Sequence, residues 1–108
     1  MLYTIEQIQS IVEPIAKKYN LKAVYLFGSY ARGTANEHSD VDLLIDTTGS
    51  GLDTFFKLGA VYTDFADALD KEVDLITVSS LEQPAQRPSD VLFRDAVMRE
   101  RRNVYAVA

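Results

Sequence analysis

The chain has 108 residues, 47% of them hydrophobic, and a formal net charge of −5 at pH 7. This length suits one domain over residues 1–108, large enough to bury a core without cross-links. The chain contains no cysteine and one histidine, which excludes a disulfide framework, a thiolate zinc site and a histidine-rich metal site. The acidic balance argues against direct binding of nucleic acid, because contact with phosphate backbones requires surplus lysine and arginine.

No apolar stretch approaches the roughly 20 residues that span a bilayer, and the N-terminus lacks a signal-peptide pattern. We therefore expect a cytoplasmic protein with no membrane partner. The charge is uneven, since residues 94–108 hold four basic and two acidic side chains, against seven and fourteen in residues 1–93. The basic segment 94–102 is either a docking surface for an acidic partner or the solvated face of a helix, and its arginines are Arg94, Arg99, Arg101 and Arg102.

Hydrophobic periodicity divides the chain into alternating helices and strands. The expected elements are a helix over 4–19, a strand over 22–27, a helical turn over 30–32, a strand over 41–46, a helix over 52–69, a strand over 72–78 and a helix from 89 to about 101. Segments 33–39, 47–51 and 79–88 are expected to be loops or irregular, and the apolar tail 104–108 indicates no particular state.

Several residues mark where the expected helices begin, bend or end. Thr4 and Gln7 form a capping-box pattern, and Pro14 is expected to bend or split the first helix because proline lacks a backbone N–H. The other expected boundaries are Asn20 at the end of the first helix, Asp53 as the cap of the 52–69 helix, and Ser89 or Asp90 as the cap of the last.

This order of elements is typical of a small α/β domain. The connection between strands 22–27 and 41–46 is too short for a crossover helix, so these two strands are expected to be antiparallel. The prediction is a mixed sheet of about three strands flanked by about four helices.

Asp40 and Asp42 stand two apart on a strand, so both side chains point to one face, with Cα atoms roughly 6.5 Å apart. A bare Asp-x-Asp is often only a wet sheet face, but the same face here carries Leu44. Two carboxylates about 4 Å apart repel by about 4 kcal/mol at an effective dielectric near 20. A divalent cation removes that cost, and Mg²⁺ is bound by one or two carboxylates with water and substrate phosphates.

Asp74 is the one charge within the apolar run 73–78. A carboxylate in such a run requires a partner, a metal or solvent, and a solvent-facing place near the strand end is the simplest alternative. If the third strand lies beside the second, Asp74 joins Asp40 and Asp42. Three carboxylates suit a two-metal site, in which one ion activates the attacking oxygen and another steadies the leaving group.

Gly28 and Ser29 end the first strand. Glycine permits close approach of the backbone, free amides at the start of a helical turn bind phosphate, and the serine hydroxyl adds a hydrogen bond. Gly-Ser alone is an ordinary turn. However, Gly-Ser followed after ten residues by Asp-x-Asp arises by chance in about one such chain in a thousand.

Two further residues near this motif carry charge. Arg32 either neutralises phosphate or pairs with Glu37 or Asp46. His38 lies in the loop beside Ser39 and is expected to be a surface residue rather than a catalytic base.

Together these residues resemble the minimal nucleotidyltransferases, or MNT domains, of the DNA polymerase β-like superfamily. The resemblance runs from the first helix through the third strand. It implies a small polymerase β-like fold and Mg²⁺-dependent transfer of a nucleoside monophosphate, usually AMP from ATP, with release of pyrophosphate. By position, Asp40 and Asp42 match the paired metal ligands, Asp74 matches the third carboxylate (a metal ligand or general base), and Gly28 and Ser29 match the triphosphate-binding turn.

Larger relatives such as the aminoglycoside nucleotidyltransferases have a further acceptor domain, which is not expected here. Family members of this size are typically paired with a HEPN-domain toxin and act as its antitoxin by adding AMP to a tyrosine of that ribonuclease. The run 99–102 and the apolar tail match no family pattern.

The leading hypothesis is therefore Mg²⁺-dependent transfer of AMP from ATP to a hydroxyl, on a tyrosine, of a HEPN toxin, with two metal ions. One alternative is a non-catalytic antitoxin that neutralises its partner by binding. Another is the catalytic subunit of a small-molecule nucleotidyltransferase whose acceptor site comes from a homo- or hetero-oligomer. Nucleotide preference, acceptor residue and oligomeric state are not indicated by the sequence.

Overall fold

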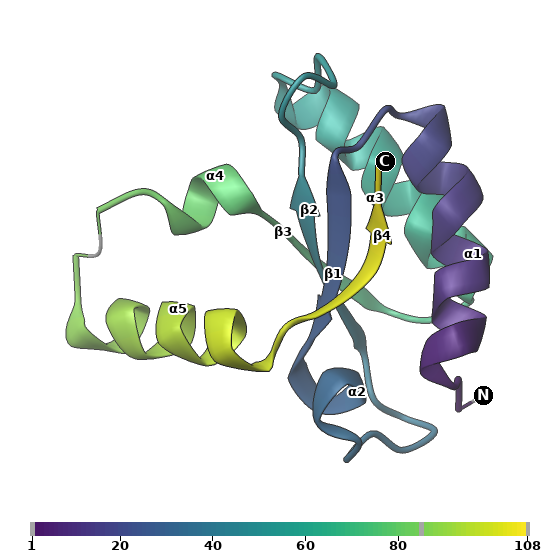
Figure 1. Ribbon diagram of the computed structural model, residues 1–108, viewed down its shortest axis with the longest axis horizontal. Helices are drawn as coiled ribbons and strands as arrows, with labels where there is room; N and C mark the ends of the chain where they lie inside the picture. Colours follow the sequence, from purple (N-terminus) through teal and green to yellow (C-terminus); the bar gives the residue numbers. More distant parts are fainter. Residues whose placement is uncertain (1, 85, 108) are drawn as a thin grey trace.

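The computed structural model describes residues 2–84 and 86–107, so Ala85 and Ala108, which fall in the predicted irregular segment and tail, lie outside the described residues. Helices and strands alternate along most of the chain (Figure 1). The strands are β1 (Ala23–Phe27), β2 (Val41–Asp46), β3 (Val73–Thr77) and β4 (Arg102–Ala106). The helices are α1 (Ile5–Lys18), α2 (Gly28–Arg32), α3 (Phe55–Leu69), α4 (Val78–Leu81) and α5 (Pro88–Glu100).

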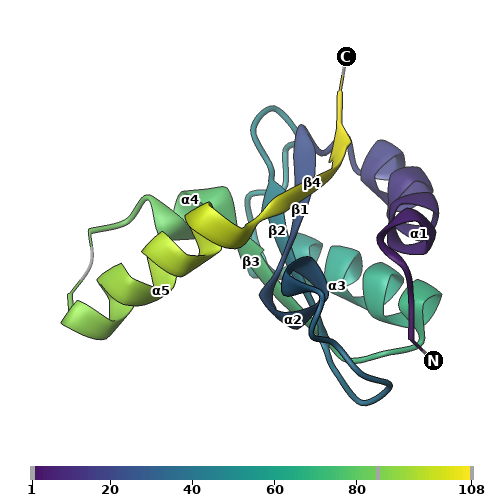
Figure 2. The ribbon, with the colours of Figure 1, turned by 60° about the horizontal axis from the view of Figure 1, so that its bottom comes forward.

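The strands form one mixed sheet in the order β3-β2-β1-β4. β1 is antiparallel to both of its neighbours, while β2 and β3 are parallel and are joined through α3. Figures 1 and 2 show α1 and α3 on one side of the sheet and α4 and α5 on the other. The predicted α/β class and mixed sheet, including the antiparallel first pair, are confirmed.

β4 is a strand that the sequence did not indicate, which makes four strands in place of about three. Arg101 caps α5 with extended backbone angles, φ −60° and ψ 144°, so the chain passes from helix to strand with no turn between them. The strand pairs with β1 and buries Val104. Without a turn signal, the charged run at 99–102 and a short apolar tail do not read as a strand.

Helix α1 begins at the predicted capping box, in which Thr4 and Gln7 exchange side-chain and backbone hydrogen bonds. The helix passes through Pro14 without interruption, so the expected split is wrong. Proline has no N–H to donate to the carbonyl of Ser10, four residues earlier. Pro14 is exposed, so this carbonyl lies on the solvent side of the helix. Burial of Ile8 and Val12 on the opposite side holds the helix against the sheet.

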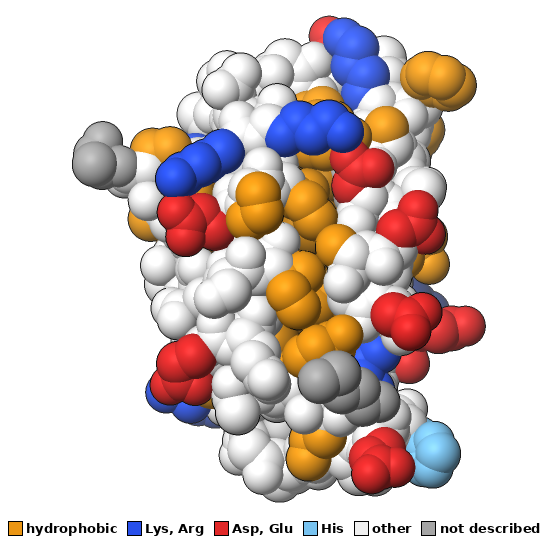
Figure 3. All heavy atoms as spheres, turned by 90° about the vertical axis from the view of Figure 1, so that its right-hand side faces the viewer, with side chains coloured by type: hydrophobic (Ala, Val, Ile, Leu, Met, Phe, Trp, Pro, Cys, Tyr) orange, Lys and Arg blue, Asp and Glu red, His pale blue; other side chains and the backbone are white. Residues whose placement is uncertain are grey.

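The two faces of the sheet are covered unequally. Most buried residues belong to a large core between the sheet and helices α1 and α3. Beyond this core, on the outer side where α1 lies, hydrophobic side chains form a line with acidic and basic side chains around it (Figure 3). The opposite face holds a small cluster of buried residues, Phe27, Leu44 and Val97. Val97 is the buried residue that α5 contributes to this cluster, and burying a side chain of this kind stabilises the fold by about 1.5–3 kcal/mol.

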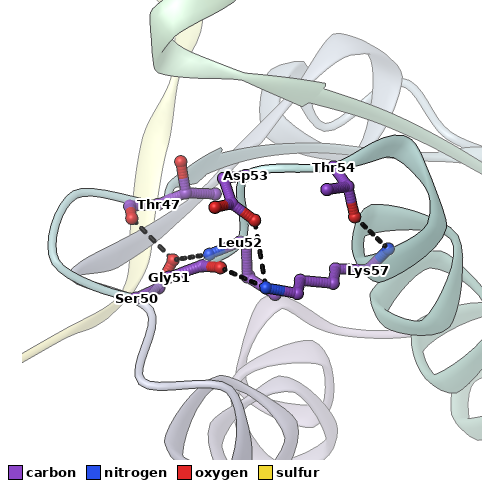
Figure 4. A network of polar contacts seen from close by, with 7 residues as sticks. All are labelled: Thr47, Ser50, Gly51, Leu52, Asp53, Thr54 and Lys57. Atoms are coloured by element: carbon purple, nitrogen blue, oxygen red, sulfur yellow. Dashed lines mark hydrogen bonds and ion pairs between the residues drawn. The ribbon is translucent and has the colours of Figure 1, made fainter.

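The connection from β2 to α3 is a polar turn that corrects one predicted cap (Figure 4). Ser50 Oγ donates to the Thr47 carbonyl at 2.6 Å. Thr54, not Asp53, caps α3, because its Oγ1 accepts from the Lys57 amide at 3.2 Å. Asp53 is instead paired with the Lys57 ammonium at 3.0 Å, outside the helix.

The segment after β3 differs from its prediction in two places. The predicted irregular stretch 79–88 overlaps α4, a short helix capped by the hydroxyl of Thr77, and this is the helix beyond the expected four. The last helix begins at Pro88, with Arg87 as its N-cap in place of Ser89 or Asp90. Proline suits the first helical position, because the N–H that it lacks has no partner there. Within the described ranges, no helix combines the length and apolar character needed to cross a membrane.

Candidate active site

The Gly-Ser turn forms where β1 ends and α2 begins. Gly28 has φ +70°, a conformation in which a side chain is strained, and it starts α2 directly after the extended Phe27. Gly33, with φ +77° and ψ 18°, ends the helix. The predicted helical turn is confirmed, and it places Ser29 in its first turn and Arg32 at its last position.

Strand register brings two of the predicted carboxylates together. Phe27 lies opposite Asp42 in the β1–β2 pair, and Asp42 lies opposite Asp74 in the β2–β3 pair. Because neighbouring strands lie about 4.8 Å apart, the two aspartates are adjacent on the sheet. Asp40 lies just before β2. Asp40 and Asp74 are exposed, while Asp42 is half-buried, so Asp74 occupies the solvent-facing position considered from the sequence.

One cavity, of about 470 Å³, joins the turn and the carboxylates. It lies between the sheet and α5 and includes all the predicted site residues. Its lining residues are Phe27, Gly28, Ser29, Arg32, Ser39, Asp40, Asp42, Asp74, Phe93, Ala96, Val97 and Glu100. The residues predicted from the sequence therefore form one wall of the cavity, on the side of the turn and the strands.

The other wall, from α5, was missed. Phe93, Val97 and Glu100 recur at spacings of four and three residues, so they share one helix face. Phe93 also lies against Phe27, with ring centroids 6.2 Å apart. That spacing was the available signal, but nothing in the sequence linked this helix face to the aspartates.

The Asp42 carboxyl lies against Gly28, in the space that a side chain at residue 28 would fill. A Cβ added at residue 28 would lie 2.0 Å from Oδ2 of Asp42 and 2.9 Å from its Cγ. Only glycine leaves room for this carboxyl, so the turn and the β2 carboxylate are packed as one unit.

The carboxylates are poorly compensated. The pKa of Asp42 is raised to about 6, chiefly by burial of its carboxyl. Hydrogen bonding with Asp74, repulsion from Asp74 and repulsion from Asp40 raise it further, in that order. The positive charge of Arg32 acts in the opposite direction on the same pKa. A site with surplus negative charge and one nearby guanidinium is suited to a ligand that brings cations with it.

Arg32 pairs with neither of the acids considered from the sequence. Its Nη1 lies 3.1 Å from Oε2 of Glu100 on α5, so pairing with Glu37 or Asp46 is wrong. His38 is exposed, as expected for a surface residue.

The arginines of the basic segment 94–102 are not all solvated. Arg94 donates to the Gln83 carbonyl, and the guanidinium of Arg101 lies 4.4 Å from the centre of the Tyr25 ring. These contacts tie α5 to the segment before it and to β1.

The carboxylates fit a divalent metal by their chemistry. Mg²⁺ prefers carboxylate oxygens, and Asp42 and Asp74 lie side by side on neighbouring strands. The raised pKa of Asp42 reflects the negative charge of its neighbours as well as burial, and a bound cation would offset that charge. In the described part of the chain, no three Asp, Glu or His side chains already converge as a complete ligand set. Asp40 and Asp74 are the exposed carboxylates that line the cavity with Asp42.

Comparison with known proteins gives a consistent result. The family described as polymerase beta, nucleotidyltransferase, matches residues 7–102. A Methanocaldococcus jannaschii protein named as a candidate protein adenylyltransferase is 33% identical over 94 residues, covering 80% of this chain and 90% of its own. Protein adenylyltransferase MntA of Thermococcus cleftensis is 32% identical over 85 residues, covering 75% and 84%.

A structural comparison agrees on the fold. A chain in the structure of a tri-AMPylated Shewanella oneidensis HEPN toxin in complex with an MNT antitoxin superposes with a TM-score of 0.64 at 16% identity. The match covers 95% of this chain and 73% of that one. The fold expected from the sequence is therefore confirmed.

Proposed function

The chain belongs to the polymerase beta nucleotidyltransferase family, and on that basis we propose that it transfers AMP from ATP to a hydroxyl of a HEPN-domain toxin, on a tyrosine, and so acts as an antitoxin. The observation that carries this proposal is the placement of the Gly28–Ser29 turn and the Asp42–Asp74 pair in one cavity. Relatives of this chain are named as protein adenylyltransferases, and these names support the reaction class. ATP is available in the cytoplasm, where the chain would act.

In this proposal, separate residues of the cavity bind the triphosphate and the metal. The free amides at the start of α2 and the Ser29 hydroxyl bind the triphosphate, and Arg32 neutralises part of its charge. Asp40, Asp42 and Asp74 would hold Mg²⁺, with two ions proposed. When bound, the metal neutralises phosphate charge and assists both the attacking and the leaving oxygen.

The chemical step is an in-line displacement at the α-phosphorus. The acceptor hydroxyl oxygen forms the new P–O bond, the bond to the β-phosphate oxygen breaks, and pyrophosphate leaves. We assign uptake of the hydroxyl proton to Asp74, because it is exposed at the cavity and lies beside Asp42. Positioning and charge stabilisation supply most of the catalysis in such transfers.

Intact mass spectrometry of the partner tests this proposal. The HEPN-domain protein is incubated with the chain, ATP and Mg²⁺, and an AMP-sized increment is expected on the partner. The Asp40→Asn/Asp42→Asn double variant should give none. A complex that forms and neutralises the toxin without any increment would favour the binding antitoxin, and AMP transfer only to a small molecule would favour the third hypothesis.

A further inference from the structure

The Arg32–Glu100 ion pair joins two elements that are far apart in the sequence. Arg32 is the last residue of α2 and Glu100 the last residue of α5, and 68 positions separate them. Arg32 Nη1 lies 3.1 Å from Glu100 Oε2, and both side chains line the cavity. With side chains 48% and 27% exposed, this is the least exposed ion pair among the described residues.

Both partners are held in place by their backbones. Arg32 is three residues after Ser29 in α2, which ends at Gly33. Two residues beyond Glu100, Arg102 pairs with Leu26 of the inner strand β1. Val97, one turn before Glu100, is only 3% exposed. The backbones of the two helix ends are therefore both anchored, which keeps the Arg32 and Glu100 side chains within reach of each other.

Among the described residues that line the cavity, the pair leaves no free cation. Arg32 is the one Lys or Arg among the described residues that line the cavity. The acidic residues that line it are Asp40, Asp42, Asp74 and Glu100. A triphosphate that enters beside Ser29 requires the Arg32 guanidinium, which Glu100 already occupies. A phosphate oxygen and the Glu100 carboxylate present the same kind of acceptor to this guanidinium, so they compete for it.

We propose that Glu100 is the resting counter-ion of Arg32, that the nucleotide triphosphate displaces it, and that Glu100 thereby sets the affinity for nucleotide. Glu100 is a positioning residue, because it acts through Arg32 and not on the reacting atoms. This inference rests on the proposed function, since only a phosphate-bearing substrate brings the competing anion.

The test is the dissociation constant of a non-hydrolysable ATP analogue with Mg²⁺, measured by titration calorimetry. Glu100→Gln should bind the analogue about threefold to fivefold more tightly, the range of a partly exposed ion pair. Asp95→Asn removes the same charge from an exposed α5 position that does not line the cavity, and it should leave the constant unchanged. The gain from Glu100→Gln should shrink at high salt, which screens exposed charges.

A double variant separates a specific pair from general electrostatics. In an Arg32→Gln background, Glu100→Gln should have no effect, because the residue it acts through is gone. Tightening that persists there, or weaker binding by Glu100→Gln alone, would overturn the inference while the proposed function stands. If the wild-type chain binds no nucleotide, the proposed function fails and this inference fails with it.

Discussion

Gly28 and Asp42 come from two different strand ends, yet a Cβ on the first would lie 2.0 Å from a carboxylate oxygen of the second. The absence of a side chain at residue 28 therefore determines where the β2 carboxylate can stand. The Gly-Ser turn has two roles in this site: it offers backbone amides, and it makes room for the acid beside them.

Gly28→Ala is expected to displace Asp42 and to lower AMP transfer by about 100-fold, since a shift near 1 Å in a catalytic group has that effect. It should also destabilise the fold by more than the roughly 1 kcal/mol that a left-handed alanine costs alone. Activity and the free energy of unfolding in urea measure the two effects.

Gly49→Ala is the matched control, because Gly49 has φ +77° and no atom within 4 Å of an added Cβ. It should cost about 1 kcal/mol of stability and leave transfer unchanged. Equal losses in the two variants would show that backbone strain, not contact with Asp42, explains the effect of Gly28→Ala.

Asp74→Asn should reduce transfer by at least about 100-fold while the fold stays intact, because it removes a carboxylate from the metal and acceptor side of the site. Asp46→Asn is the control, because it makes the same change at the last residue of β2, which does not line the cavity. There the Asp46 side chain accepts a hydrogen bond from the Thr48 amide. Transfer by this control should match wild type. A fully active Asp74→Asn variant would remove Asp74 from the mechanism.

Stability of the metal-free protein should depend on Asp42 in a defined direction. Its pKa is about 6 in the folded chain, against an ordinary value of 3.8 for an unfolded aspartate, so the folded state holds this proton more tightly. The resulting stabilisation is complete below pH 4 and is lost as the pH rises through about 6.

With a chelator present, the free energy of unfolding of Asp42→Asn should therefore rise relative to that of wild type by about 1 kcal/mol as the pH goes from 4 to 7. This value allows for solvent screening of a half-exposed group. Urea unfolding at several pH values measures the difference. A difference that does not change with pH would contradict the raised pKa.

The sequence predicted the half of the site that its local pattern encodes. Gly28, Ser29, Asp40 and Asp42 fall within one short stretch, and β2 has the predicted bounds. Asp74 joins them because β2 and β3 are parallel neighbours, which the helix between them favours. Such elements are specified by nearby residues.

The contributions of α5 and β4 are long-range and were not predictable in the same way. Glu100 meets Arg32 only because β4 returns to pair with β1. Nothing near either residue encodes that pairing. The sequence offered Glu37 and Asp46 as partners for Arg32 because they are near it in the chain, whereas the folded chain brings up a more distant acid.

The docking of β4 gives a stability prediction. Val104 is 5% exposed, and Val104→Ala should cost about 2 kcal/mol in the free energy of unfolding. Val107→Ala makes the same change at a position that is 53% exposed and should cost less than about 0.5 kcal/mol. Similar losses in both variants would indicate that the tail does not pack on β1 as described.

The most direct test of the site is a crystal structure with a non-hydrolysable ATP analogue and Mn²⁺, which gives an anomalous signal. We expect the triphosphate on the Gly28–Ser29 turn and Mn²⁺ peaks between it and the Asp42 and Asp74 carboxylates. Nucleotide bound in another cavity, or Mn²⁺ away from these aspartates, would contradict the assignment of this cavity as the active site.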